Sequence, residues 1–144
     1  IAYGFYSQYP RQFIKIATAG ALAYLLTDQL SAHVIKAIVH RIRPCNNPAI
    51  EARLLLDYCG SGLSFVSAHA ANTFGTATLV TLVSTNKKFS VAAGIWAVVV
   101  SFSQVYVGVH FPADVIGGAL LGVLVGSGIA LGLKRFVALE RAQL

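Results

Sequence analysis

Four long stretches of apolar residues divide the chain, and they constrain its fold more than any other feature. They lie near residues 12–40, 70–84, 89–109 and 113–133. A helix needs about 20 apolar residues to cross about 30 Å of hydrocarbon, and each stretch is close to that length, the second being the shortest. Backbone groups in lipid need partners within the protein, and the stretches lack the alternation of barrel strands. The sequence therefore predicts an all-α bundle with at least four membrane-spanning helices.

The composition agrees with a membrane protein and sets the number of domains. The 144 residues are 56% hydrophobic and 11% charged, and their mean hydropathy is +0.70, so one membrane domain over residues 1–144 is predicted. The chain begins at Ile1 and contains no Met, which predicts that N-terminal residues are missing. Residues 1–10 are aromatic and uncharged and do not resemble a signal peptide.

The net charge of +6 raises the question of a nucleic-acid partner. The basic residues are scattered between apolar stretches instead of forming one polar face, so we expect a lipid bilayer and no nucleic acid. Seven of them flank the stretches on one side, which the positive-inside rule assigns to the cytoplasm: Arg11, Lys15, Lys87, Lys88, Lys134, Arg135 and Arg141. The other four fall near the opposite end, where an anionic ligand would explain them: Lys36, Arg41, Arg43 and Arg53.

A long loop separates the first two apolar stretches. We expect a helix over residues 11–42 to end near Pro44 and the loop to cover residues 44–66 on the extracytoplasmic side, with a short helix at 49–58. The loop contains Cys45 and Cys59, which would form a disulfide in an oxidising compartment or remain free thiols. As the one long loop, it is expected to frame a functional site.

Polar residues from two parts of the chain are expected at the loop side of the bundle. Lys36 and Arg43 are seven residues apart and would lie about two turns apart on one side of a helix. Ser67 and His69 lie where the second helix is expected to begin, so the neighbouring N–H groups and the helix dipole would attract an anion there.

A third pair, His110 and Asp114, lies between the last two apolar stretches. Its four-residue spacing lets the carboxylate hold the imidazole if the turn is near-helical. Pro112 suits the first turn of the last helix. A purely structural hydrogen bond would also explain the pair. We expect Asp28, His33 and His40 to be hydrogen-bonded inside the bundle or solvated at its rim.

Small residues predict how the last helix packs. Glycine recurs there at four-residue spacing, at Gly118, Gly122 and Gly126. A stripe of this kind lets a neighbouring helix approach closely.

Three stretches in order resemble the motifs of the type 2 phosphatidic acid phosphatases. KAIVHRIRP, residues 36–44, matches the first motif of Lys, six residues and Arg-Pro. VSAH, residues 66–69, matches part of Pro-Ser-Gly-His, and SQVYVGVHFPAD, residues 103–114, matches Ser-Arg, five residues, His, three residues, Asp. The resemblance covers about half of the chain and implies the helical membrane fold of that family.

The resemblance also implies a role for each matching residue. His110 would be the nucleophile that forms a phosphohistidine, Asp114 would orient it, and His69 would serve as general acid and then base. The phosphoryl oxygens would be bound by Lys36, Arg43, Ser67, the backbone N–H of Ala68 and the residue at position 104, here Gln104. The chemistry needs neither a metal nor a cofactor.

The sequence departs from the family at three positions. Val66 and Ala68 replace proline and glycine, and Gln104 replaces arginine. Glutamine offers phosphate a neutral amide, whereas arginine offers a charged guanidinium with two parallel donors. Arg41 or Arg53 would have to supply the missing positive charge, or the protein is a divergent or impaired member.

The function implied is hydrolysis of a lipid phosphate or pyrophosphate at the periplasmic face of a bacterial inner membrane. Lipid A 1-phosphate or a polyprenyl pyrophosphate is the expected substrate, with phosphatidylglycerol phosphate as an alternative. Two different functions would also fit the residues: transport, because intramembrane ionisable residues also mark transport pathways, and lipid binding by a catalytically impaired protein. The oligomeric state does not follow from the sequence.

Overall fold

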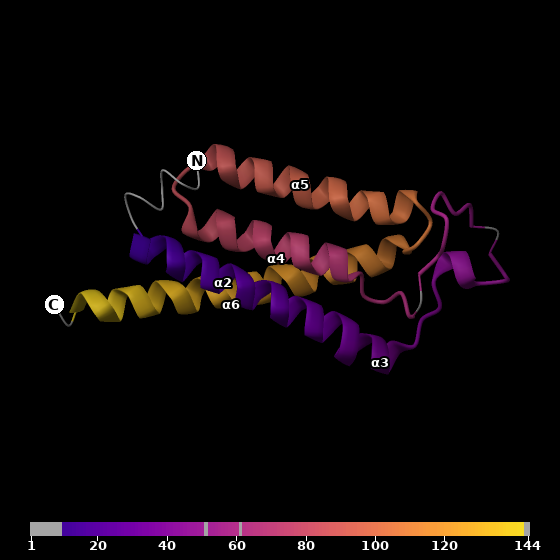
Figure 1. Ribbon diagram of the computed structural model, residues 1–144, viewed down its shortest axis with the longest axis horizontal. Helices are drawn as coiled ribbons and strands as arrows, with labels where there is room; N and C mark the ends of the chain where they lie inside the picture. The colour runs from indigo at the N-terminus through magenta and orange to yellow at the C-terminus, as the bar shows by residue number, and fades with distance from the viewer. Residues whose placement is uncertain (1–9, 51, 61, 143–144) are drawn as a thin grey trace.

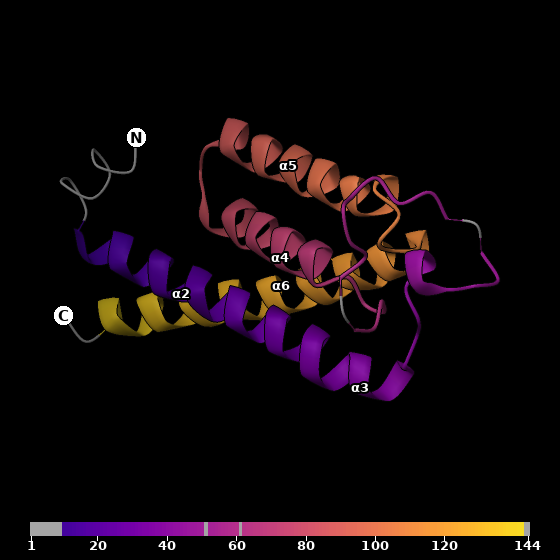
Figure 2. The same cartoon turned by 45° about the vertical axis from the view of Figure 1, so that its right-hand side comes forward.

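Long helices lie side by side in the computed structural model, which describes residues 10–50, 52–60 and 62–142, without the side chains of 10–12 and 138–142 (Figures 1 and 2). They are α2 (Pro10–Gln29), which continues through the π-helical η1 (Leu30–Ile35) into α3 (Lys36–Val39), then α4 (Ala68–Val83), α5 (Lys87–Tyr106) and α6 (Pro112–Ala142). An isolated bridge between Ile42 and Leu63 is the only β pairing among the described residues. The prediction of an all-α bundle is confirmed.

Two of these helices are long and apolar enough by themselves to cross a bilayer. They are α5, with 20 residues, and the 26 residues of α6 from Pro112 to Val137. On α5 large apolar side chains point outward, and Phe102 is 65% exposed, as expected where a helix meets acyl chains instead of water. The shorter α4, with 16 residues, lies in the middle of the bundle between α5 and α6 (Figure 1).

The glycine stripe of α6 packs directly on α4, as predicted. A Cβ on Gly118, Gly122 or Gly126 would overlap a backbone carbonyl oxygen of α4 or its N-cap, at Ser67, Ala71 and Gly75 respectively. Alanine residues of α4, including Ala70 and Ala71, are fully buried in this contact. The two backbones approach this closely because neither helix presents a large side chain at the interface.

The first helix ends earlier than the sequence suggested. Its last residue is Val39, and His40 adopts a left-handed conformation with φ of 49° while its N–H donates to the carbonyl oxygen of Lys36 at 3.1 Å. A left-handed residue closes the last turn and redirects the chain. Residues 40–42, expected to be helical, therefore already belong to the loop, and the extended Arg43 does not share a helix with Lys36 as expected.

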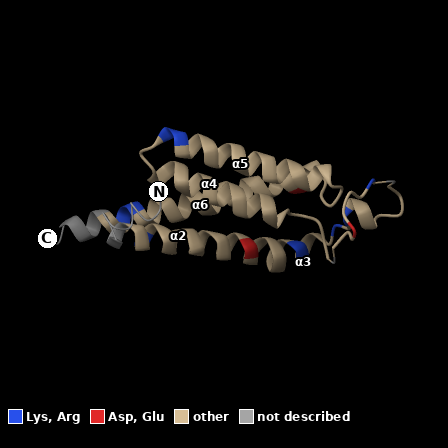
Figure 3. Ribbon diagram, turned by 45° about the horizontal axis from the view of Figure 1, so that its top comes forward, with Lys and Arg blue, Asp and Glu red and all other residues tan. Residues whose placement is uncertain are grey.

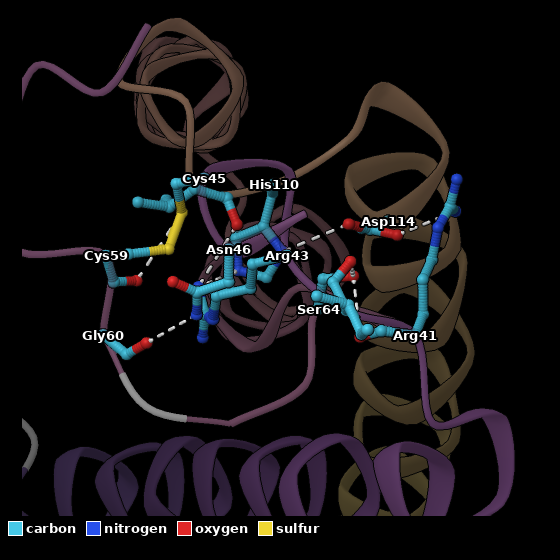
Figure 4. The surroundings of a disulfide bond; sticks show 11 residues. Arg41, Arg43, Cys45, Asn46, Cys59, Gly60, Ser64, His110 and Asp114 are labelled. Carbon is cyan, nitrogen blue, oxygen red and sulfur yellow. Dashed lines mark hydrogen bonds and ion pairs between the residues drawn. A yellow bond between two sulfur atoms is a disulfide. The ribbon is translucent and has the colours of Figure 1, made fainter. Parts of the chain in front are cut away.

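The loop itself contains one 3₁₀ turn, η2 (Pro44–Asn46), and a disulfide between Cys45 and Cys59 (Figure 4). The predicted short helix at 49–58 is wrong, since the described residues of that segment are irregular. The physical reason is that its backbone bonds elsewhere: the N–H of Leu55 donates to the carbonyl oxygen of Val107 at 3.3 Å, in the α5–α6 connection.

Basic residues gather at the two ends of the bundle, as Figure 3 shows. One end holds the start of α2, the end of α6 and the α4–α5 turn. There α5 begins at Lys87, and the ammonium of Lys15 lies 5.4 Å from the ring centre of Phe136. The other end holds the long loop and the α5–α6 connection (Figure 1). The side chains of Arg11 and Arg141, which we assigned to the first end, lie outside the described residues.

Candidate active site

A buried histidine and a buried aspartate lie together where α6 begins. The Nδ1 atom of His110 is 3.4 Å from Oδ2 of Asp114, and the two side chains are 3% and 0% exposed. The same Oδ2 accepts a hydrogen bond from the backbone N–H of Phe111 at 2.9 Å. Because Pro112 starts α6, the carboxylate falls in the first turn, one helical turn after the imidazole.

The other ring nitrogen of His110 faces a guanidinium. Nη1 of Arg43 lies 3.4 Å from Nε2 of His110 and also donates to the carbonyl oxygen of Val109 at 3.3 Å. The imidazole is thus held between a carboxylate at Nδ1 and a cation at Nε2 (Figure 4). An anion that reached Nε2 would meet the guanidinium at once.

The protonation of His110 follows from its surroundings. Burial lowers the pKa of His110 below the usual 6.5, and the charge of Arg43 lowers it further. The carboxylate of Asp114 acts in the opposite direction, but at 3.4 Å the contact is longer than an ordinary hydrogen bond. The imidazole is therefore neutral at neutral pH, with a lone pair available on one nitrogen.

The second oxygen of Asp114 bonds to a residue that we considered for phosphate binding. Nη1 of Arg41 lies 3.0 Å from Oδ1 of Asp114, and the Arg41 guanidinium lies 4.2 Å from the ring centre of Phe111. The charge of Arg41 is thus paired inside the site (Figure 4). The sequence did not predict this pairing, because Arg41 and Asp114 are 73 residues apart and no spacing rule connects them.

The start of α4 approaches the start of α6. Ser67 is the N-cap of α4, and its Oγ accepts a hydrogen bond from the N–H of Ala70 at 3.4 Å. The backbone N–H of Ser67 donates to the carbonyl oxygen of Asp114 at 2.9 Å. The helix that begins at Ala68 therefore directs its N-terminus toward the end of the bundle that holds the pair, and a helix N-terminus attracts anions.

Two of the predicted site residues form no direct bond with the pair. The side chain of His69 is exposed in the first turn of α4, and Lys36 is partly buried at the start of α3. Among the described residues, no hydrogen bond or ion pair joins either side chain to His110 or Asp114. Their positions leave them available to a ligand.

Gln104 contributes to the site through its backbone. Its carbonyl oxygen accepts hydrogen bonds from the N–H groups of Val109 at 3.2 Å and His110 at 3.1 Å, which shapes the turn after α5. Its side-chain amide donates to Oγ of Ser103 at 3.3 Å. The expected contact of this side chain with phosphate stays a prediction.

The described part of the chain contains no group of three His, Cys, Asp or Glu side chains placed to hold a metal ion. The groups that converge are an imidazole, a carboxylate, guanidinium groups and a helix N-terminus. Such a set is suited to an anionic substrate and to nucleophilic attack by a neutral histidine.

Comparison with known proteins agrees with this interpretation of the site. The sequence profile of the PAP2 superfamily matches residues 17–137. The lipid A 4'-phosphatase of Bacteroides thetaiotaomicron is 32% identical over 115 residues, which cover 75% of this chain and 51% of that protein. The phosphatidylglycerophosphatase B of Bacillus subtilis is 36% identical over 107 residues, which cover 68% of this chain and 49% of that protein. The chain thus spans about half the length of these curated relatives.

The fold is also similar to that of a solved structure. The crystal structure of a transmembrane PAP2-type phosphatidylglycerolphosphate phosphatase from Bacillus subtilis aligns with a TM-score of 0.69 at 25% identity, covering 93% of this chain and 65% of that one. The helical arrangement described above is therefore shared with an integral membrane protein.

Proposed function

This chain belongs to the PAP2 superfamily, and on that premise we propose that it is a membrane phosphatase that hydrolyses a lipid phosphate or pyrophosphate through a phosphohistidine. The observation that carries the proposal is the buried His110, held between Asp114 at Nδ1 and Arg43 at Nε2. A neutral imidazole with one nitrogen oriented by a carboxylate and the other beside a cation is arranged for attack on a phosphoryl group.

In the first step, Nε2 of His110 attacks phosphorus and the bond from phosphorus to the leaving oxygen breaks. The proton on Nδ1 faces Asp114, which stabilises the positive charge that develops on the ring. His69 gives a proton to the leaving oxygen, so the lipid departs as an alcohol, or as a phosphate when the substrate is a pyrophosphate. The exposed position of His69 on α4 leaves it free to meet the leaving group.

In the second step, water replaces the histidine on phosphorus. His69, now neutral, accepts a proton from the water as it attacks, and the bond from phosphorus to Nε2 breaks. Inorganic phosphate leaves, and His110 returns to its neutral form with its proton on Nδ1. The cycle consumes one water and needs no cofactor.

The negative charge of the phosphoryl group requires donors around it. Arg43 already lies beside Nε2 of His110, and Lys36 is on the helix that leads into the same loop. The hydroxyl of Ser67 and the backbone N–H of Ala68 add the N-terminus of α4 to these two cations. Such donors stabilise the transition state, where the charge is spread over the phosphoryl oxygens.

Separate observations support the substrate and the membrane face that we propose. The relatives act, by their names, on lipid A and on phosphatidylglycerol phosphate, and we favour lipid A or a polyprenyl pyrophosphate as substrate, with phosphatidylglycerol phosphate as the alternative. The disulfide of the loop supports an oxidising compartment. We therefore place the site at the periplasmic face of a bacterial inner membrane.

The test is phosphate release by the purified protein in detergent or vesicles, from a panel that contains lipid A, undecaprenyl pyrophosphate and phosphatidylglycerol phosphate. We expect phosphate release from at least one lipid and loss of that release in His110→Ala. When the reaction uses a substrate labelled at phosphorus and is quenched without acid, the label should be found on His110. His33→Ala is the matched control, because His33 is an exposed histidine to which no role in the reaction is assigned. Binding of lipid phosphate without release would instead indicate an impaired lipid-binding protein.

A further inference from the structure

We infer that Arg41 is a positioning residue, which fixes Asp114 so that Asp114 can orient His110. The inference rests on the proposed function, because it assigns Arg41 a part in the same reaction. Its basis is that the two oxygens of Asp114 have different partners. Oδ2 contacts Nδ1 of His110 and the N–H of Phe111, whereas Oδ1 bonds to Nη1 of Arg41 at 3.0 Å.

Burial makes a charged partner for Asp114 necessary. The carboxylate is 0% exposed, and an ionised carboxylate away from water is strongly destabilised unless it is paired and hydrogen-bonded. His110 is neutral in the resting site, and Arg43 contacts His110 instead of Asp114. Among the described residues, Arg41 is the one arginine or lysine that forms an ion pair with Asp114.

Arg41 is itself held in place by contacts on two sides. Its guanidinium lies over the ring of Phe111 at 4.2 Å. Its backbone carbonyl oxygen accepts hydrogen bonds from the N–H and the hydroxyl of Ser64, at 2.8 and 3.2 Å, and Ser64 is fully buried. Arg41 therefore joins the loop after α3 to the segment before α4 and to the first turn of α6, as Figure 4 shows.

These contacts also distinguish Arg41 from a phosphate ligand. The charge of Arg41 is already paired with the carboxylate of Asp114, whereas no carboxylate among the described residues forms an ion pair with Arg43. Arg43, two residues later, has Nη1 within 3.4 Å of Nε2 of His110 and is the better placed of the two arginines for that role. Arg43 thus contacts the imidazole at Nε2, whereas Arg41 acts on the Nδ1 side through Asp114.

The first experiment separates turnover from binding. For Arg41→Met we expect kcat to fall roughly tenfold or more, with KM within about twofold of the original, because a hydrogen-bonded charge pair is lost and substrate contacts are kept. Arg41→Lys should restore part of kcat, since it keeps the charge but not the fork. Arg135→Met is the matched control, because it removes an exposed arginine near the end of α6, at the opposite end of the bundle. A rise in KM at unchanged kcat for Arg41→Met, or an equal loss of kcat in Arg135→Met, would overturn the inference.

The second experiment asks whether Arg41 acts through Asp114. In an Asp114→Asn background we expect Arg41→Met to lower kcat by less than about twofold further, because residues that act as one unit are non-additive. Losses that multiply would contradict the inference while leaving the phosphatase proposal intact. Thermal unfolding of the same four proteins measures the coupling without any activity. If the unmodified protein releases no phosphate from any lipid, the proposed function fails, and the unfolding data alone decide whether Arg41 holds Asp114.

Discussion

The backbone N–H of Ser67 donates a hydrogen bond of 2.9 Å to the carbonyl oxygen of Asp114. Ser67 caps α4 and Asp114 lies in the first turn of α6, so the starts of the two helices are bonded to each other. His69 follows on α4 and His110 precedes α6. The proposed acid and nucleophile therefore depend on the packing of these two helices, and changes in that packing should alter the reaction.

Substitution of a glycine in the contact between α4 and α6 tests whether the reaction depends on this packing. A Cβ at Gly122 would overlap the carbonyl oxygen of Ala71, whereas a Cβ at Gly128 meets nothing within 4 Å. We expect Gly122→Ala to lower the free energy of unfolding by about 1–3 kcal/mol through overpacking and to reduce phosphate release. Gly128→Ala, on the same helix, should be neutral or slightly stabilising. Thermal unfolding in detergent checks both, and equal effects of the two changes would contradict the close contact.

The disulfide should stabilise the loop that carries Arg41 and Arg43. Cys45 and Cys59 are separated by 14 positions, and a closed loop of that length is worth about 3 kcal/mol in the chain-entropy estimate. We expect reduction, or the double change Cys45→Ser and Cys59→Ser, to lower Tm and kcat. Reductant added to the double variant is the control, and it should have no further effect. Unchanged activity after verified reduction would show that the disulfide does not support the site.

The pH dependence should reflect the neutral state of His110. Since the pKa of His110 is lowered below 6.5 by burial and by Arg43, the imidazole gains its proton, and activity is lost, only as the pH falls below that value. Removing the cation in Arg43→Gln should raise the pKa of His110 and move the acid limb of kcat/KM to higher pH. Lys87→Gln, at the other end of the bundle, is the control. All proteins are compared on the same substrate, so that titration of the substrate affects each profile equally. An acid limb that moves to lower pH in Arg43→Gln would contradict the assignment of that limb to His110.

Substitution of Gln104 tests whether its side chain faces the phosphoryl group. We expect Gln104→Arg to raise the affinity for inorganic phosphate or to raise turnover, because a charged fork replaces a neutral amide. The side chain now bonds to Ser103, so Gln104→Met is the control that removes this bond without adding charge. The measurements are the inhibition constant of phosphate and kcat. Kinetics that stay unchanged in Gln104→Arg would show that the position does not face the phosphoryl group.

Much of the fold could be predicted from the sequence because it depends on local and periodic features. The apolar stretches gave α4, α5 and α6 to within a few residues at most ends, although α6 continues to Ala142. Ser67 was expected at a helix start and is the N-cap of α4, and the glycine stripe lies against α4 as expected. The loop was less predictable, because its backbone bonds to distant segments such as Val107.

The sequence by itself determined the membrane character, the helices and the residues available for phosphate chemistry, since hydropathy, capping and motif spacing act over short distances along the chain. Only the tertiary structure decided which groups pair. It placed Arg43 against His110 and Arg41 against Asp114, whereas the sequence left both arginines as candidates for phosphate. The reason is that a buried carboxylate selects its partner by distance and direction in space, and these are set by the packing of α4 on α6 and by the path of the loop that Cys45 and Cys59 close.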